Sequence, residues 1–382
     1  MRGGIAAAAL WLGVAACGDD GSTSDTSTGS TGTPATSDAP TTEAGSTSAM
    51  ATTAASTSGA DSSGGPGNTS TTTDAATDST GAGAGTSSPP LQFVAVTFNT
   101  GGHADGEADV ADQEYGNGLS WTPAVEQTTA WFASLQPEVV VFQEIFYSPD
   151  CQNIDPQFHP GYVCESWSPG DPTVAQVVLG PGYQIACNLG KTDKCAAVRT
   201  DFGSFVGCDA DFCLDGLDGA QVPDCGGGSR VGRGVIDLVD GGQLTIVNFH
   251  GTSGFLPADQ LCRVAQVEQV FLDLDGQPAA NGDRNLILGD LNTDPGRAEL
   301  FDLSAARWND FVGGNEPFDF ITDVGNNATP TYAGTLNIDH QVSDWFVGNC
   351  WHPGVTPGYD AVVDFSYYDH VPAVCLLSEP AR

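Results

Sequence analysis

Between Leu91 and Arg382, apolar residues occur in short runs with two different periods. Residues 92–99 alternate with period two, which is typical of a half-buried strand, and residues 139–142 form a short apolar run typical of a strand covered on both faces. Residues 125–135 have helical spacing. Residues 258–272 predict a second helix after Pro257, with an apolar stripe formed by Leu261, Val264, Ala265, Val267 and Phe271.

The second half of this region contains further strand-like runs. Residues 234–239 and 244–249 flank Asp240-Gly241-Gly242, which is a good hairpin signal. Residues 285–288 predict a buried strand that Gly289 ends, and residues 344–347 and 371–377 predict two late strands. Strands and helices therefore alternate along the chain, and this alternation favours a layered α/β domain.

The first ninety residues have a different pattern. Residues 5–16 are apolar, follow the single cation Arg2 and are too few to span a bilayer, as expected of a secretory signal. The run ends in Val14-Ala15-Ala16-Cys17, which resembles the lipobox of bacterial lipoproteins, in which the cysteine is lipidated. A plain signal peptide cut near Ala16 is the alternative.

Residues 18–90 consist mainly of Ser, Thr, Gly, Ala, Asp and Pro, with no aromatic residue and no Lys or Arg. Such a segment buries too little apolar surface to offset the entropy of ordering it. We therefore expect three parts: a signal segment with lipobox (1–17), a disordered linker (18–90) and a folded domain (91–382). The predicted location is outside the cytoplasm, anchored to the cell envelope or cell surface through Cys17.

The folded domain is strongly acidic. The chain has 48 acidic and 11 basic residues, and eight acidic residues and one basic residue precede Leu91, which leaves the domain with a net charge of −30. This balance disfavours a basic groove for nucleic acid phosphates. We expect a monomer that acts on a small phosphoester, with nucleic acid as the alternative partner.

Ten cysteines follow Cys17, and no CxxC pair typical of a zinc site occurs among them. An even number of cysteines behind an export signal predicts disulfides, although their connectivity cannot be read from the sequence. The segments 151–187 and 200–228 are rich in Gly, Pro, Asp and Cys, and we interpret them as disulfide-stapled surface insertions.

Candidate chemistry begins with Gly289-Asp290-Leu291-Asn292. In an extended chain Asp290 and Asn292 lie on the same side, because side chains alternate with period two. Carboxylate and amide oxygens suit Mg²⁺ or Ca²⁺. A turn after a core strand explains the same residues equally well.

Other polar residues also lie where predicted strands end, and functional groups in layered α/β folds gather at one end of the sheet. In chain order these residues are Asn99, Gln143-Glu144, Asn248 and His250, Asp290 and Asn292, Asp339, and Asp369-His370.

In this order the set resembles the endonuclease/exonuclease/phosphatase superfamily. The motifs are Thr97-Phe98-Asn99, Gln143-Glu144, Ala196-Ala197-Val198-Arg199, Asn248-Phe249-His250, Gly289-Asp290-Leu291-Asn292, Ile338-Asp339 and Asp369-His370. The resemblance implies a two-sheet α/β sandwich of the DNase I-like type. Tyr368 stands where the family often has Ser, and His340 stands where an aromatic residue is common.

The resemblance also implies a role for each residue. Glu144 is expected to be the principal metal ligand, with Asn99 and Asp369 completing the metal environment. Asp290 is expected to position the attacking water, Asn292 to hold a phosphate oxygen and His250 to assist the leaving group. His370, oriented by Asp339, is expected to contact the phosphoryl group. The implied cofactor is Mg²⁺, with Mn²⁺ or Ca²⁺ as alternatives, and the Cys-rich insertions are expected to select the substrate.

These residues favour a divalent-metal-dependent hydrolase of phosphoester bonds, either a phosphodiesterase or a phosphatase. A DNase I-like extracellular nuclease and a non-catalytic surface binding module on the same fold are the alternatives. A Ca²⁺-binding adhesion domain, suggested by the acidic run 209–218, ranks lower because the run lacks the spacing of a known calcium loop.

Overall fold

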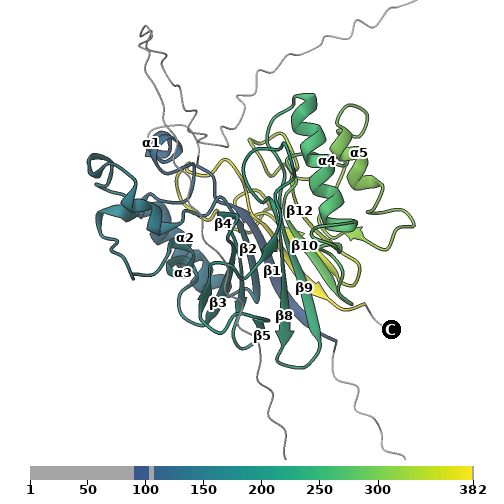
Figure 1. Cartoon of the computed structure of the whole chain (residues 1–382), viewed down its shortest axis with the longest axis horizontal. Helices are drawn as coiled ribbons and strands as arrows, with labels where there is room; N and C mark the ends of the chain where they lie inside the picture. Colours follow the sequence, from purple (N-terminus) through teal and green to yellow (C-terminus); the bar gives the residue numbers. More distant parts are fainter. Residues whose placement is uncertain (1–89, 103–106, 381–382) are drawn as a thin grey trace, which may run out of the picture. The chain divides into compact units, whose positions relative to one another are not determined.

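Two seven-stranded sheets stack in the part of the chain that the computed structural model describes, residues 90–102 and 107–380 (Figure 1). Helices lie on the outer faces of the sheets, which confirms the expected two-sheet α/β sandwich. The predicted signal segment, Cys17 and all of the predicted linker except Pro90 lie outside the described residues. No helix in the described residues is long and apolar enough to cross a membrane.

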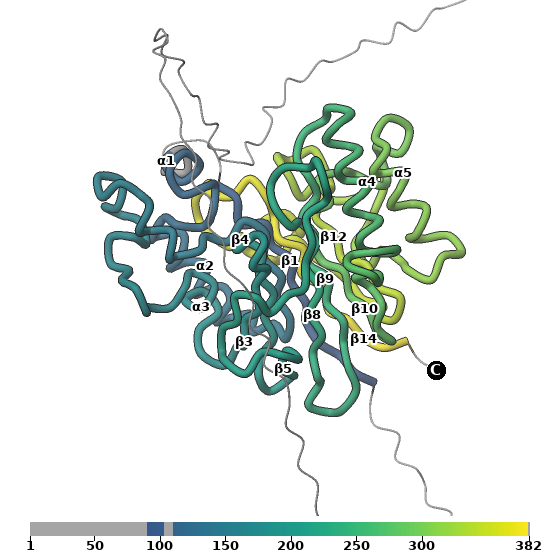
Figure 2. Tube along the Cα trace, in the orientation of Figure 1, coloured from purple at the N-terminus to yellow at the C-terminus, as the bar shows by residue number. Residues whose placement is uncertain are grey.

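The first sheet has the strand order β13-β14-β1-β2-β4-β3-β6. Its strands are β1 (Gln92–Asn99), β2 (Val139–Gln143), β3 (Tyr183–Asn188), β4 (Lys191–Arg199), β6 (Phe212–Cys213), β13 (Val347–Trp351) and β14 (Ala373–Ser378). Strand β1 is parallel to β2 and antiparallel to β14, so strands from the two ends of the described chain lie side by side (Figure 2).

The second sheet has the strand order β11-β12-β10-β9-β8-β5, and β7 pairs with β8. Its strands are β5 (Gly203–Phe205), β7 (Asp218–Gly219), β8 (Val231–Leu238), β9 (Gln243–His250), β10 (Asn285–Asp290), β11 (Asp319–Phe320) and β12 (Asp339–Ser343). The predicted hairpin is confirmed as β8 and β9, and β10 runs parallel to β9. Carboxyl ends of β9 and β10 therefore meet at one edge.

Helices flank the sheets on opposite sides in Figure 1. They are α1 (Glu107–Glu114), α2 (Thr122–Leu135), α3 (Val174–Leu179), α4 (Pro257–Phe271) and α5 (Leu303–Asn309), with 3-10 helices at Ser148–Gln152, Pro156–Phe158 and Val163–Glu165. Helix α2 has a proline in its first turn, and Gln136, which follows its last residue, has a left-handed φ of 48°. The first-turn proline suits a helix start, because the amide it lacks would have no partner there.

Apolar residues form three layers of core. Phe93 and Val141 of the first sheet pack with Ile246 and Leu288 of the second, so one layer lies between the sheets. The second layer joins α2 and α3 to the outer face of the first sheet, and the third joins α4 and α5 to the outer face of the second. Each fully buried side chain of this kind contributes about 1.5–3 kcal/mol. The sheets therefore form a rigid platform for the side chains at their ends.

Three sequence expectations about elements are wrong. Residues 344–347 are not a strand: Asp344 to Phe346 form the turn between β12 and β13, where the Asp344 carboxylate accepts hydrogen bonds from Asn285 N (2.8 Å) and Nδ2 (2.6 Å). Gly289 does not end β10, which continues to Asp290. A side chain at Gly289 would collide with the Phe249 carbonyl of β9, so glycine permits close strand contact.

The third error concerns segments 151–187 and 200–228, which are not simply surface insertions. The first contains α3 and most of β3, and the second contains β5, β6 and β7. The Thr173 hydroxyl accepts a hydrogen bond from Gln176 N, and the Gln176 side chain accepts one from Thr173 N, which begins the helix.

The apolar stripe predicted for α4 is also wrong in most positions. Only Val267 of the five predicted residues is fully buried, and Leu261 is 57% exposed. The buried face consists of Arg263, Gln266, Val267, Gln269 and Val270. Burial of polar side chains is tolerated because they find partners: Gln266, for example, donates to Thr252 Oγ1 (2.7 Å) and accepts from Thr252 N (2.9 Å).

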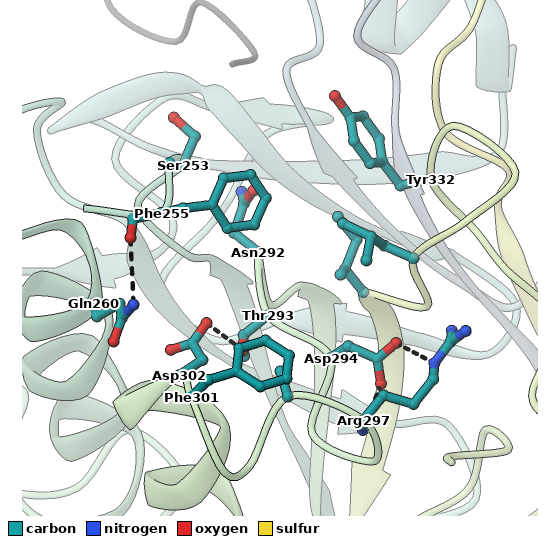
Figure 3. Close-up of a pocket in the computed structure, with 14 residues that line it drawn as sticks. Ser253, Phe255, Gln260, Asn292, Thr293, Asp294, Arg297, Phe301, Asp302 and Tyr332 are labelled. Atoms are coloured by element: carbon teal, nitrogen blue, oxygen red, sulfur yellow. Dashed lines mark hydrogen bonds and ion pairs between the residues drawn. The ribbon is translucent and has the colours of Figure 1, made fainter. Parts of the chain in front are cut away.

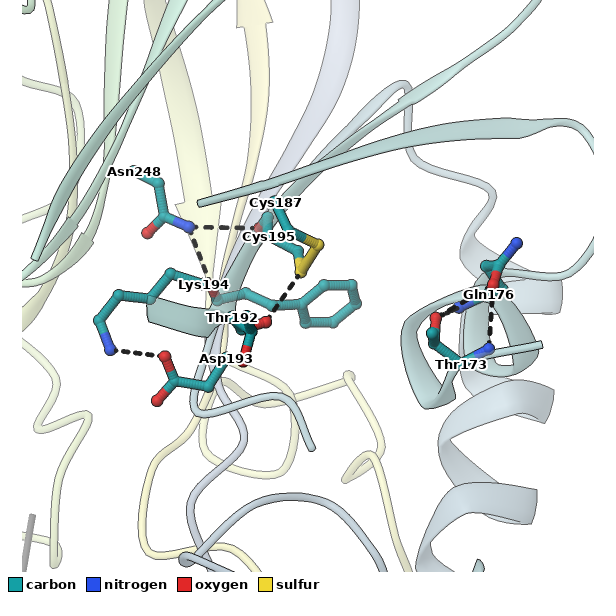
Figure 4. The surroundings of a disulfide bond; sticks show 9 residues. Thr173, Gln176, Cys187, Thr192, Asp193, Lys194, Cys195 and Asn248 are labelled. Atoms are coloured by element: carbon teal, nitrogen blue, oxygen red, sulfur yellow. Dashed lines mark hydrogen bonds and ion pairs between the residues drawn. A yellow bond between two sulfur atoms is a disulfide. The ribbon is translucent and has the colours of Figure 1, made fainter. Parts of the chain in front are cut away.

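Five disulfides join all ten cysteines of the described residues, as predicted in number. They are Cys151–Cys164, Cys187–Cys195, Cys208–Cys213, Cys225–Cys262 and Cys350–Cys375. Two of them join neighbouring strands of the first sheet, β3 to β4 and β13 to β14. Figure 4 shows the Cys187–Cys195 bridge beside Asn248, whose Nδ2 donates to the Cys195 carbonyl (3.3 Å).

Candidate active site

Two pairs of parallel strands, one pair in each sheet, deliver polar side chains to one end of the sandwich. Strand β1 ends at Asn99, and Glu144 follows β2. In the second sheet β9 ends at His250 and β10 ends at Asp290. Register pairs Asn99 with Gln143 in the first sheet and Asp290 with His250 in the second, and a hydrogen bond from Asn99 Nδ2 to Asp290 Oδ2 (3.1 Å) joins the two sheet ends. These residues therefore gather at one end of the sandwich, as the sequence suggested.

Asn99 links the two sheets. Its Nδ2 donates to Glu144 Oε1 (3.2 Å) and to Asp290 Oδ2 (3.1 Å), and its Oδ1 accepts from Gly101 N (2.9 Å). In this orientation the amide donates to the carboxylates, and it would have to turn for its oxygen to become a metal ligand. A side chain at Gly101 would meet the Glu144 carboxylate and would displace it from its present position.

Asp290 and Asn292 lie together, but not on an extended chain as expected. The strand ends at Asp290, and Asn292 has a left-handed φ of 49°. Asp290 Oδ1 accepts from Asn292 N (2.7 Å), and Asp290 Oδ2 accepts from Asn292 Nδ2 (3.0 Å). Burial raises the pKa of the Asp290 carboxyl, and the negative charge of Asp339 adds to the rise. The left-handed turn at Asn292 therefore keeps the Asp290 and Asn292 side chains in contact.

Asp339 and His370 form a buried pair. His370 Nδ1 lies 2.8 Å from Asp339 Oδ2, and Nε2 faces Asp290 Oδ2 at 3.7 Å and Asp369 Oδ1 at 3.9 Å. Burial lowers the pKa of His370, but the carboxylates of Asp339, Asp369 and Asp290 outweigh it and leave the pKa well above its usual range. The hydrogen bond that Asp339 Oδ2 accepts from Nδ1 fixes the His370 ring, so that Nε2 points into the site.

His250 lies against the other side of the same cluster. Its Nε2 is 3.3 Å from Glu144 Oε1 and 3.7 Å from Asp290 Oδ2, and its side chain is 1% exposed. Glu144, like Asn292, has a positive φ, of 57°. Left-handed backbone at a residue other than glycine costs free energy and is concentrated at functional sites, because packing holds it there. The strained backbone therefore lies at two predicted site residues, the metal ligand Glu144 and the catalytic residue Asn292.

A divalent cation fits the charge of this site. Glu144, Asp290, Asp339 and Asp369 each lie within hydrogen-bond or ion-pair distance of His250 or His370. Two imidazoles cannot balance four carboxylates even when both are protonated. In addition, Asp339 Oδ1 is buried with no hydrogen-bond partner among the described residues. The excess negative charge and the unused oxygen both suit a cation.

The structure suggests a ligand group that differs from the expected one. Asp290, Asp339 and His370 each offer one ligand atom, and these atoms all lie within 4.8 Å of one another. The set expected from the sequence, Asn99, Glu144 and Asp369, stays a prediction. Asn99 and Glu144 are hydrogen-bonded to each other, and Asp369 approaches His370.

Two residues near the site had no place in the sequence prediction. Asn117 Nδ2 donates to Glu144 Oε2 (2.8 Å), and Asn117 Oδ1 accepts from Gly102 N (2.8 Å). Tyr332 packs on His370 with 4.7 Å between ring centroids. Asn117 lies in Gly116-Asn117-Gly118, and Gly-Asn-Gly was a detectable turn signal, although nothing in it indicated contact with Glu144.

A buried amide pair connects the sheets beneath the site. Gln143 Nε2 donates to Asn248 Oδ1 (3.0 Å), and Asn248 Nδ2 donates to the Phe142 carbonyl (2.9 Å). Gln143 and Asn248 therefore position the site without reaching it. His340 also stays outside, since its ring nitrogens contact Thr322 Oγ1 (2.8 Å) and the Asn337 carbonyl (3.0 Å).

A pocket of about 290 Å³ opens beside Asn292. Its lining comes from residues 253–260, 292–302 and 332–338, and Figure 3 shows Phe255, Phe301 and Tyr332 around it. None of these segments belongs to the Cys-rich stretches 151–187 and 200–228. The Cys-rich stretches, which were expected to select the substrate, therefore do not line this pocket.

Comparison with known proteins gives matches at the level of structure. No family model and no curated protein matches the sequence. The human Nocturnin catalytic domain with bound sulfate has 13% identity and a TM-score of 0.45, covering 76% of this chain and 95% of that one. An endonuclease/exonuclease/phosphatase family protein from Bacteroides thetaiotaomicron has 12% identity and a TM-score of 0.41, covering 77% and 97%.

A mutant of beta toxin from Staphylococcus aureus with bound magnesium ions has 13% identity and a TM-score of 0.40, covering 75% of this chain and 99% of that one. Identities and TM-scores this low transfer no residue role from these proteins to this chain.

Proposed function

We propose that this protein hydrolyses phosphoester bonds with the help of a divalent cation, Mg²⁺ in the first instance. The observation that carries the proposal is the convergence, at one end of the sandwich, of two imidazoles and four carboxylates from both sheets. The order of the motifs along the chain, which resembles the endonuclease/exonuclease/phosphatase superfamily, supports the same reaction class.

Each residue can be given a part in that reaction. Asp290, which accepts hydrogen bonds from Asn99 and Asn292, would orient and deprotonate the attacking water. Asn292 lines the pocket, and its Nδ2, which donates to Asp290 Oδ2 and the Gly251 carbonyl, would turn to hold a phosphate oxygen. His370, oriented by its hydrogen bond to Asp339, would contact the phosphoryl group, and His250, beside Glu144, would protonate the leaving oxygen.

The cation would be held by residues of the two groups described above, Asp290, Asp339 and His370, or Asn99, Glu144 and Asp369. When bound, it would neutralise the anionic oxygens of the phosphoester. In the reaction the oxygen of water bonds to phosphorus, the ester P–O bond breaks, and the leaving oxygen takes up a proton. A diester gives a phosphomonoester and an alcohol.

The acidity of the domain favours small substrates over nucleic acid. A net charge of −30 repels a polyanion at long range, and Lys or Arg contacts would normally reverse that penalty. A small phosphoester needs only the site residues and the cation. We therefore rank a DNase I-like nuclease second, and a binding module without turnover third.

The location is part of the proposal. We propose that the mature protein is exported, lipid-anchored at Cys17 and held away from the membrane by the linker. Detergent partitioning of wild type against Cys17→Ser tests this: the wild type should enter the detergent phase and the variant should not. Equal partitioning of both into the aqueous phase would remove the anchor.

The activity test is hydrolysis of bis-p-nitrophenyl phosphate with Mg²⁺, with and without EDTA. His250→Ala and His370→Ala should each lower turnover by about 10²–10⁴-fold, a common value for positioned acid–base groups. His159→Ala is the matched control, because this histidine is half-buried outside the site and contacts the Ile154 carbonyl. Turnover that survives both EDTA and the two site variants would exclude the proposal.

A side-by-side assay separates the three functions. Plasmid DNA and small phosphoesters are compared at fixed ionic strength. Faster turnover of small phosphoesters per phosphate supports the proposal, and efficient plasmid nicking without small-substrate turnover supports the nuclease. Binding without turnover of either substrate supports the binding module.

A further inference from the structure

Exposed apolar side chains gather on two short segments near the site. Residues 255–261, at the start of α4, and 300–303, at the start of α5, hold six of the sixteen exposed large apolar residues in the described chain. Leu300 is 97% exposed, Phe301 is 75% exposed and Leu256 is 68% exposed; the others are Phe255, Leu261 and Leu303. We call this set the apolar rim. Clusters of this kind mark interaction surfaces.

The two segments of the rim are fixed to each other. Leu303 N donates to Gln260 Oε1 (3.1 Å), and Arg263 Nη2 donates to Asp302 Oδ2 (2.9 Å). Arg263 is completely buried and also donates to the Thr252 and Gly254 carbonyls, both at 2.7 Å. The rim is therefore held as one surface before any partner arrives, which lowers the entropy cost of docking.

The rim continues into the candidate active site. Phe255 and Phe301 line the pocket of about 290 Å³, and Asn292 and Tyr332 line the same pocket (Figure 3). Asn292 is bonded to Asp290, and Tyr332 packs on His370. An apolar group in this pocket would therefore lie next to a phosphoester at the catalytic residues. Leu256 and Leu300 do not line the pocket, so a small solute does not account for their exposure.

The charged residues in and beside the apolar rim restrict the chemistry of the partner that can dock there. The cations closest in sequence to the rim, Arg263 and Arg297, are paired with Asp302 (2.9 Å) and Asp294 (2.6 Å). The rim segments themselves contain only acidic charges, Asp259 and Asp302. A surface of this composition has no means of attracting an anionic polymer or an anionic membrane, but it can bury apolar area in an electrically neutral interface.

We propose that the apolar rim docks on a zwitterionic lipid surface, and that the substrate is a phosphoester of an amphiphile whose apolar part enters the adjoining pocket. This inference rests on the proposed hydrolase function for its substrate, but the docking itself does not require turnover. It assigns the exposed residues 255–261 and 300–303 a role that no residue of the catalytic cluster supplies.

The test uses the full chain carrying Cys17→Ser, so that acylation cannot contribute to membrane binding. Cosedimentation with phosphatidylcholine vesicles is measured for this background and for the double variant Leu256→Ser/Leu300→Ser. The double variant should lower the partition coefficient by at least about tenfold, because burial of one large apolar side chain is worth about that much or more. Added salt should not weaken binding, and anionic lipid should not strengthen it.

Val239→Ser is the matched control, because Val239 is 71% exposed at the β8–β9 turn, away from the site end of β9. It should bind vesicles like the background. Leu256→Ser should not destabilise the chain, since Leu256 is the N-cap of α4 and serine is favoured there. Equal vesicle binding by the background and the double variant would overturn the docking proposal.

Activity separates this inference from the proposed function. With bis-p-nitrophenyl phosphate, the double variant should match the background. With a phospholipid in vesicles, it should be slower by at least the loss in binding. No turnover of either substrate, with rim-dependent vesicle binding intact, would overturn the hydrolase and keep the docking. Equal loss on both substrates would overturn the separate docking role.

Discussion

Replacing Arg263 by methionine removes the cationic half of a buried ion pair while keeping much of the side chain's volume. Arg263 makes hydrogen bonds to Asp302 Oδ2, Ser304 Oγ and the carbonyls of Thr252 and Gly254, all between 2.7 and 2.9 Å. Asp302, which is only 6% exposed, then loses its cation. The carbonyls of Thr252 and Gly254 each lose a hydrogen-bond donor. Such a change should unlock the two segments of the apolar rim.

The expected cost follows from the burial. Removing one partner of a buried ion pair typically costs about 3–5 kcal/mol, because a charge stays buried without compensation. For a folded body of this size that corresponds to a melting temperature lower by roughly 5–8 °C. In the double variant Arg263→Met/Asp302→Asn the unpaired charge is gone, so part of the loss should return.

pH gives an independent check on this explanation. Burial raises the pKa of Asp302, but hydrogen bonds from Ser304 and Thr293 and the charge of Arg263 outweigh it and lower the pKa below its usual range. Its stabilising effect is therefore present above the unfolded pKa and lost as pH falls through the folded pKa. Without Arg263 the folded pKa rises. The gap in stability between wild type and Arg263→Met should then be widest near pH 7 and narrow in acid.

Urea unfolding of the full, disulfide-intact chain measures these differences. Arg233→Met is the matched control, since Arg233 pairs with Asp218 at 3.6 Å and the Asp218 side chain is 78% exposed. Surface pairs of this kind are worth about 0–1 kcal/mol. A loss in Arg263→Met no larger than in the control, or a double variant no more stable than the single one, would refute the reasoning.

Three further predictions follow from single contacts. Asn117→Leu should lower turnover with little change in substrate KM, because Glu144 loses the donor to Oε2; unchanged turnover would leave Asn117 a purely structural residue. Burial lowers the pKa of His340 to about 4, so the free energy of unfolding should fall as pH drops below the unfolded pKa of this histidine. Between pH 7 and pH 5 the wild type should lose about 2 kcal/mol more than His340→Gln. Equal losses in urea unfolding would contradict this. Thiol titration of the denatured, unreduced protein should find no free thiol from Cys151 onward, and two or more would contradict the five bridges.

Much of the fold could be predicted because apolar periodicity reports local geometry. The run at 92–99 became β1 without any shift of its ends, and the two arms around Asp240-Gly241-Gly242 became the β8–β9 hairpin. The predicted cluster at the strand ends also formed, since parallel neighbours such as β9 and β10 end at one edge. These features depend on neighbours in sequence or in a sheet.

The errors arose where distant partners decide the structure. The buried face of α4 includes Arg263 beside apolar residues because Arg263 binds residues near 253 and 303, which no helical period can reveal. Asn117 reaches Glu144 from a turn that looks like any loop. Asn292 stays close to Asp290 through a left-handed turn and not through the extended backbone that the period-two pattern predicts.

The Cys350–Cys375 bridge bears on how the protein survives proteolysis. It joins β13 to β14 and closes a segment of 25 residues that contains Asp369 and His370. Part of this segment is exposed at Val355 and Tyr359, each 46% accessible, where a protease could cut. After such a cut both new ends would remain tied to neighbouring strands of one sheet. His370 would stay attached on its carboxyl side through β14, so a nicked molecule should retain its site until the bridge is reduced.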